Sequence, residues 1–97
     1  MKKIDFFSIV KDLCNLHESK MYDYSDGDDP YSNFVAAANS IGIKPHHYVT
    51  ARIAEKLHRL ESLITQSKNP KHESISDAYQ DIACMSIIAI ELLEREA

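Results

Sequence analysis

The sequence is poor in the residues that interrupt regular structure, and it has no long hydrophobic run. Its 97 residues include only 2 glycines and 3 prolines, whereas all-β proteins of this size need frequent turn residues. No apolar segment reaches the roughly 20 residues that a membrane-spanning helix needs. The N-terminal stretch MKKIDFFSIVKDL lacks the long apolar run and the small-residue cleavage site of a signal peptide. We therefore expect a helical, cytoplasmic protein.

Several signatures of catalysis and metal binding are also missing. The chain has no G-x-S-x-G motif, no glycine-rich phosphate loop and no Cys-x-x-Cys pair. Cys14 and Cys84 lie in apolar-periodic segments, which predicts two buried thiols in a reducing compartment. His46 and His47 are adjacent, which is not the spacing of a helical zinc pair, so we expect no zinc site.

The composition is that of one small globular domain. Hydrophobic residues make up 44% and charged residues 27%, and the length predicts a single all-α domain over residues 1–97. The formal net charge of −4 argues against a DNA or RNA polymer as partner, although a local basic pocket stays compatible with it. A core this small is only marginally stable alone, so we expect a homo-oligomer.

Hydrophobic periodicity predicts four helices. Their expected ranges are about 4–21, 31–40, from 45 to the segment SKNPK, which ends the third helix, and 74–94. The apolar stripes predicted for the first three are Phe6, Ile9, Val10, Leu13 and Leu16; then Phe34, Val35, Ala38 and Ile41; then Val49, Ile53, Leu57, Leu60 and Ile64. The last two helices are joined by a short connection, which favours an antiparallel pair. The predicted fold is a small all-α four-helix bundle that ends in a long antiparallel helical hairpin.

Local signals support these helix ends. Gly42 suits a left-handed helix stop, and Pro45 suits the first turn of the next helix. Ser74 is placed to cap the last helix, with Asp77 at the capping-box position. The interior of that helix, YQDIACMSIIAIELL, is apolar on more than one face. It is therefore expected to be the most buried helix, with a surplus face for the core or for a subunit interface.

Four aspartates crowd the segment YDYSDGDDPYSNF. No register of this segment provides the glycine and glutamate positions of a calcium-binding loop, so that motif is excluded. Asp29 before Pro30 is typical of a helix N-cap followed by a first-turn proline. A second interpretation, compatible with the first, is a lip over a ligand site that supplies Tyr24, Tyr31 and Asn33.

A basic stripe and an acidic stripe lie on the last two predicted helices. Arg52, Lys56 and Arg59 follow at spacings of four and three, so they share a helix face. Asp77 and Asp81 share a face of the last helix. Folding the hairpin about Asn69 predicts that Arg59 lies near Asp81, with Lys56 about one turn further. The stripes are then either structural ion pairs or the walls of a charged cleft in which the basic residues hold phosphate.

Residues upstream of the basic stripe extend this candidate site. His47 and Tyr48 precede it near a helix N-terminus, which is itself an anion-binding position. Tyrosine rings can stack on bases. The candidate ligand-binding residues are Arg52, Lys56, Arg59, Tyr24, Tyr31, Asn33, His47 and Tyr48.

Three stretches occur in a suggestive order: KMYDYSDGDDPYSNF, then ARIAEKLHRLESL, then ESISDAYQDIACMSIIAIELL. In that order they resemble small phage and prophage proteins of the MazG-like, all-α nucleotide pyrophosphohydrolase type, over roughly residues 18–94. The resemblance implies a helical fold and nucleotide chemistry. It also implies a magnesium site made by E-E-x-x-E on one helix and E-x-x-D on the next.

The acidic residues of that pattern are depleted in this chain. The segment AEKLH keeps only Glu55, and Lys56 and Arg59 stand beside it. Asp77 and Asp81 are one residue further apart than the pattern asks. Magnesium needs several oxygen ligands, so the electrostatics favour holding a phosphorylated ligand without a metal over hydrolysing it.

We therefore expect non-catalytic binding of a phosphorylated nucleotide-type ligand, with no cofactor and no membrane partner. In character the chain is similar to phage counter-defence proteins that sequester a host nucleotide immune signal, such as a cyclic oligonucleotide or an ADP-ribose derivative. One alternative is a magnesium-dependent, MazG-like nucleoside triphosphate pyrophosphohydrolase, with Glu55, Asp77 and Asp81 as metal ligands. The other is a protein-interaction helical module whose charged stripes are solvated faces and ion pairs.

Overall fold

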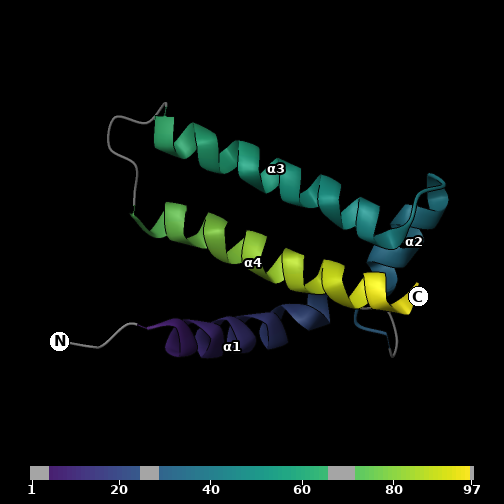
Figure 1. Cartoon of the computed structure of the whole chain (residues 1–97), viewed down its shortest axis with the longest axis horizontal. Helices are drawn as coiled ribbons and strands as arrows, with labels where there is room; N and C mark the ends of the chain where they lie inside the picture. The colour runs from purple at the N-terminus through teal and green to yellow at the C-terminus, as the bar shows by residue number, and fades with distance from the viewer. Residues whose placement is uncertain (1–4, 25–28, 66–71, 97) are drawn as a thin grey trace. The chain divides into compact units, whose positions relative to one another are not determined.

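The computed structural model describes residues 5–24, 29–65 and 72–96, without the side chains of 19–24, 72 and 73. Within these ranges every regular element is an α-helix (Figure 1). The elements are α1 (Phe6–Tyr24), α2 (Ser32–Ser40), α3 (Pro45–Thr65) and α4 (His72–Arg95). The all-α prediction with four helices is confirmed.

The chain forms two compact units, Met1–Asn33 and Phe34–Ala97. The first contains α1, and the second contains the α3–α4 pair. None of the helices in the described ranges combines the length and the hydrophobicity that a membrane span requires. The single domain and the homo-oligomer stay predictions.

A reciprocal cap begins α1. The backbone N–H of Ser8 donates to Oδ1 of Asp5 at 2.9 Å, and the backbone N–H of Asp5 donates to Oγ of Ser8 at 3.2 Å. This arrangement satisfies two donors that would otherwise lack partners. This cap was not predicted from the sequence, because the helix was expected to begin at Ile4.

The apolar stripe predicted for α1 is largely exposed. Phe6 is 73% exposed, and Ile9 and Val10 are exposed as well. Cys14 is also exposed, whereas Cys84 is buried, and neither cysteine forms a disulfide. The prediction that both cysteines are buried is therefore wrong for Cys14, because periodicity alone does not say which apolar stripe finds a partner.

Asp29 prepares the start of α2, as predicted. Its Oδ1 accepts a hydrogen bond from the backbone N–H of Tyr31 at 2.9 Å, and its carbonyl accepts one from the backbone N–H of Ser32 at 3.2 Å. An aspartate side chain that bonds the backbone two residues ahead makes an Asx turn. The aspartates at positions 26 and 28 lie outside the described residues.

Gly42 ends α2 in the predicted way. Its φ is +72°, and its N–H bonds the carbonyl of Asn39 at 3.2 Å while the N–H of Ile43 bonds that of Ala38 at 3.0 Å. This pair of bonds is a Schellman motif. The chain then enters α3 at Pro45, which is also as predicted. Ile41 falls in this stop and is 66% exposed, so its expected place on the inner face is wrong.

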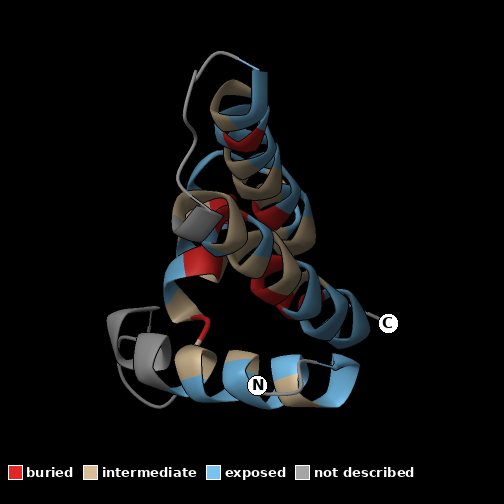
Figure 2. Ribbon diagram, turned by 90° about the vertical axis from the view of Figure 1, so that its left-hand side faces the viewer, coloured by how far each residue is buried: buried red, intermediate tan, exposed pale blue. Residues whose placement is uncertain are grey.

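Helices α3 and α4 pack side by side as the predicted antiparallel hairpin (Figure 1). Among the described residues, His46 near the start of α3 contacts Glu96 just after α4, and Lys56 further along α3 pairs with Asp81 earlier in α4, as expected for antiparallel helices. The buried residues of the second unit lie on α2, α3 and α4 (Figure 2). They are Phe34, Ala38, Val49, Leu60, Ala78, Cys84, Met85, Ile88 and Leu92.

Helix α4 supplies more of this core than any other helix in the described ranges, as expected. Complete burial of an isoleucine or leucine contributes roughly 1.5–3 kcal/mol, and Ile88 and Leu92 are both at most 1% exposed. The helix starts at His72, two residues before the predicted cap. Ser74 therefore lies inside the first turn rather than ahead of it, and the predicted capping box there is wrong. Asn69 and Pro70 lie outside the described residues.

Candidate functional site

The basic residues of the predicted stripe lie along α3 but differ in how far they are buried. Lys56 and Arg52 are partly buried, with side chains 28% and 39% exposed. Arg59 is exposed. Helix α3 is turned so that Lys56 lies at the contact with α4, while Leu57 and Ile64 of the predicted apolar stripe are 46% and 50% exposed.

Lys56 makes the cross-helix ion pair that the sequence analysis assigned to Arg59. Its Nζ lies 3.6 Å from Oδ2 of Asp81, whose side chain is 24% exposed. The predicted register is therefore displaced by about one helical turn. Because a partly buried carboxylate needs compensation, Asp81 competes with any ligand for the charge of Lys56.

The guanidinium of Arg52 has fewer of its N–H donors paired than it could pair. Its Nη1 lies 3.5 Å from Oε2 of Glu55, three residues further along α3. An exposed pair of this kind is worth only ~0.2–1 kcal/mol. The Nε atom of Arg52 is buried without a hydrogen-bond partner. An unsatisfied buried donor costs about 1–3 kcal/mol, so an acceptor placed beside Arg52 would recover part of this cost.

The N-terminus of α3 offers little to an anion. Pro45 has no N–H, and the N–H groups of His47 and Tyr48 bond the carbonyl of Lys44 at 3.0 and 3.1 Å. The donors that make a helix N-terminus an anion site are thus mostly absent or engaged within this described turn. This geometry leaves few N–H donors available to an anion at the start of α3.

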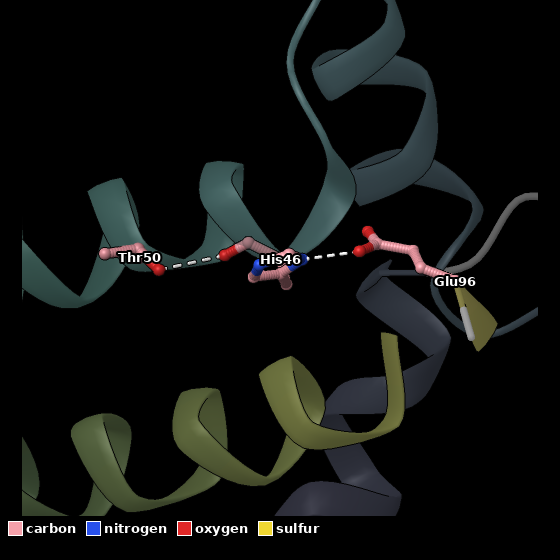
Figure 3. A network of polar contacts seen from close by, with 3 residues as sticks. All are labelled: His46, Thr50 and Glu96. Atoms are coloured by element: carbon pink, nitrogen blue, oxygen red, sulfur yellow. Dashed lines mark hydrogen bonds and ion pairs between the residues drawn. The ribbon is translucent and has the colours of Figure 1, made fainter. Parts of the chain in front are cut away.

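A contact missed by the sequence analysis joins this end of α3 to the end of α4 (Figure 3). Nδ1 of His46 lies 2.7 Å from Oε2 of Glu96, and both side chains are 22% exposed. Nδ1 has no well-formed hydrogen bond, and the contact is an ion pair when the imidazole is protonated. Oγ1 of Thr50 donates to the carbonyl of His46 at 2.9 Å. No pattern in the sequence pointed to Glu96.

The aromatic side chains near this end lie in different settings. The ring of Tyr48 is half-buried, with its centroid 6.2 Å from that of Phe34. His47 is exposed, and its ring meets His46 edge-on at 4.3 Å. His47 is therefore accessible to a ligand, whereas Tyr48 is held partly within the core of the second unit.

The expected lip belongs to the first unit. Tyr31 is 5% exposed, and its hydroxyl lies within hydrogen-bond distance of Nε2 of His17, at 3.2 Å. The ring of Tyr31 is therefore buried against its neighbours and is not available to stack on a ligand. Asn33 is exposed, and α1 ends at Tyr24, whose side chain lies outside the description. A lip made by these residues stays a prediction.

The three acids of the hydrolase alternative lie on two helices. Glu55 is 65% exposed and pairs with Arg52, whereas Asp81 pairs with Lys56. Asp77 is exposed on α4. In the part of the chain that the structure describes, no three His, Cys, Asp or Glu residues form a metal-binding group. A magnesium site at these residues stays a prediction of the alternative.

Comparison of the chain with known protein families, with curated proteins and with solved structures finds no match.

Proposed function

We propose that the second unit binds a phosphorylated nucleotide-type ligand through the basic stripe of α3, without hydrolysing it. The observation that carries the proposal is the partly buried guanidinium of Arg52, whose Nε has no hydrogen-bond partner. Arg59 is exposed on the same side of α3. Arginine is suited to phosphate because its planar fork donates two parallel hydrogen bonds.

The contacts refine the roles within the stripe. Lys56 is engaged by Asp81, so it acts mainly as a support for the hairpin. Arg52 and Arg59 are seven residues apart, or roughly 10 Å along the helix axis. Two flexible guanidiniums at this spacing can contact one pyrophosphate or two separate phosphates. Sequestration of a nucleotide immune signal is the biological role that we attach to this binding, following the resemblance described above.

The test is an incubation followed by heat release. The purified chain is mixed with magnesium and a panel of nucleoside triphosphates, cyclic oligonucleotides and ADP-ribose derivatives, then separated from free ligand and heated. Mass spectrometry identifies what is released and what was consumed. We expect an intact nucleotide to be released from the wild type. Monophosphate and pyrophosphate in solution would instead support the hydrolase alternative, whose activity should disappear in Asp81→Asn.

Two variants locate the site. Arg52→Ala and Arg59→Ala should each weaken binding about tenfold or more, because each removes charge-assisted hydrogen bonds. Lys11→Ala is the matched control, since Lys11 is exposed on α1 and its loss changes the net charge equally. Circular dichroism checks that all three variants keep their helix content. Unchanged binding in both arginine variants contradicts the proposed site.

A second candidate function, a protein-interaction helical module, is favoured by a different observation. Helix α4 leaves large apolar side chains exposed, among them Ile87 at 57% and Ile90 at 60%. Exposed apolar patches of this kind mark interaction sites more often than isolated surface residues do. This candidate predicts that heat releases no small molecule, and that Ile90→Asp abolishes capture of a partner.

A further inference from the structure

The three cations of the basic stripe on α3 differ in what opposes their charge. Nη1 of Arg52 lies 3.5 Å from Oε2 of Glu55, which is on the same helix. Nζ of Lys56 lies 3.6 Å from Oδ2 of Asp81, which is on α4. Arg59 is exposed, and within the described ranges no carboxylate pairs with it. A phosphate group that approaches the stripe therefore competes with a different carboxylate, or with none, at each cation.

Burial decides which of the two carboxylates a phosphate can displace. The side chain of Glu55 is 65% exposed, so it can turn into solvent without any movement of the backbone, and exposed pairs of this kind are weak. The side chain of Asp81 is 24% exposed, and it belongs to the helix that packs against α3. A partly buried carboxylate needs a compensating partner, so Asp81 holds Lys56 in place. Arg52 is thus available to a ligand, whereas Lys56 is not.

The spacing of the three cations gives this difference a consequence for the ligand. The helical rise places Lys56 about 6 Å beyond Arg52 along the axis, and Arg59 about 4.5 Å beyond Lys56. Three available cations in such a row would suit the three phosphates of a triphosphate. With Lys56 withheld, two guanidiniums remain, and each has the fork that matches one phosphate group. The carboxylate of Asp81 also repels a third phosphate placed beside Lys56.

We propose that Asp81 is the residue that sets how many phosphate groups the basic stripe binds. It holds Lys56 at the contact with α4, so only Arg52 and Arg59 bind the ligand. The stripe then takes nucleotides with two phosphate groups, whether these are joined as a pyrophosphate or separate, and gains nothing from a third. This inference rests on the proposed function and narrows its ligand to that class.

Affinities for AMP, ADP and ATP test this selection, because these ligands differ only in the number of phosphates. Calorimetric titration of the full chain in EDTA removes any magnesium-dependent hydrolysis. In the wild type we expect ADP to bind more tightly than AMP, and ATP to bind no more than about threefold more tightly than ADP. In Asp81→Asn, which removes the charge but keeps the size of the side chain, Lys56 is released. ATP should then bind about tenfold more tightly than to the wild type, and the affinity for ADP should change by less than about threefold.

Further variants identify the cause of that gain. The double variant Lys56→Met, Asp81→Asn should bind ATP no more tightly than Lys56→Met alone, because the gain requires the released ammonium group. Glu91→Gln is the matched control, since Glu91 is exposed on α4 and its replacement changes the net charge by the same amount. We expect the ATP affinity of this control to stay within about twofold of the wild type. Circular dichroism checks that each variant keeps its helix content.

The inference is overturned if the wild type binds ATP more than about threefold more tightly than ADP, a comparison that needs no variant. It is also overturned if Asp81→Asn shows no gain for ATP, or if the gain persists without Lys56 or occurs equally in Glu91→Gln. If Arg52→Ala and Arg59→Ala weaken ADP binding in the same titrations, the proposed function survives that failure. Binding that neither arginine variant weakens, or no binding of any of the three nucleotides, overturns the proposed site together with this inference.

Discussion

Nζ of Lys56 on α3 lies 3.6 Å from Oδ2 of Asp81 on α4. Both side chains are about three-quarters buried, so the pair is less exposed to salt than a surface ion pair. It connects the middle of one helix to the middle of the other. Which residue pairs with Asp81 also decides whether Arg59 remains accessible to a ligand.

A double-mutant cycle can measure this pair. Lys56→Met and Asp81→Asn should each destabilise the protein, and their coupling energy should be about 0.5–1 kcal/mol, since the charges are partly shielded from water. Urea unfolding of the wild type, the two single variants and the double variant gives the coupling. The matched cycle with Arg59→Met and Asp81→Asn should give a coupling near zero. A larger coupling for Arg59 than for Lys56 would restore the register predicted from the sequence.

Substitution of Gly42 should be costly for backbone reasons alone. No atom lies within 4 Å of the position that a Cβ would occupy, and φ is +72°. Gly42→Ala should therefore lower the free energy of unfolding by about 1 kcal/mol, because the left-handed conformation is strained for an L-residue with a side chain. Gly42→Asn should cost less, since asparagine tolerates this region. Equal losses for both variants in urea unfolding would point to a cause other than φ.

Leu57 and Leu60 provide a test of how α3 is turned. The sequence assigns both to one apolar stripe, but Leu60 is 4% exposed and Leu57 is 46% exposed. Leu60→Ala should cost about 2–4 kcal/mol, because it leaves a cavity in the core. Leu57→Ala should cost about 1 kcal/mol or less. Thermal or chemical unfolding gives both values, and a reversed order would mean that α3 faces the core differently.

The reciprocal cap at Asp5 should hold the first turn of α1. Asp5→Ala removes the acceptor for the N–H of Ser8 and should cost about 1 kcal/mol of local helix stability. Hydrogen exchange of the Ser8 and Ile9 amides should accelerate several-fold. Asp12→Ala, at an exposed position within the same helix, is the control. Similar acceleration in both variants would show that lost negative charge, rather than the cap, is responsible.

The features that were predicted correctly depend on local chemistry. Gly42 and Pro45 mark a helix stop and a helix start through their own backbone preferences, and Asp29 bonds a residue only two positions away. The wrong predictions about burial in α1 and α3 and about the partner of Asp81 depend on tertiary packing, whereas the Ser74 capping box was wrong because α4 starts earlier, at His72. Periodicity shows that a helix has an apolar stripe, but it does not fix the rotation of that helix against its neighbour, which is why Lys56 rather than Arg59 reaches Asp81.

In the candidate site, too, the features set by helical spacing were predicted and those set by another helix were not. The sequence shows that Arg52, Lys56 and Arg59 share a face, because that follows from helical spacing. It does not show which of them is already neutralised, because the answer lies on another helix. The contact between His46 and Glu96 joins residues fifty positions apart, and no local pattern indicates it.

Because the two cysteines differ in exposure, their rates of reaction with a thiol reagent can report transient opening of the core of the second unit. Cys14 is exposed on α1, whereas Cys84 is buried on α4 within the unit that contains the hairpin. A thiol reagent therefore meets Cys14 in the native state and reaches Cys84 only when α4 is transiently uncovered. The ratio of the two modification rates measures how often the core opens, in the unaltered chain and without denaturant.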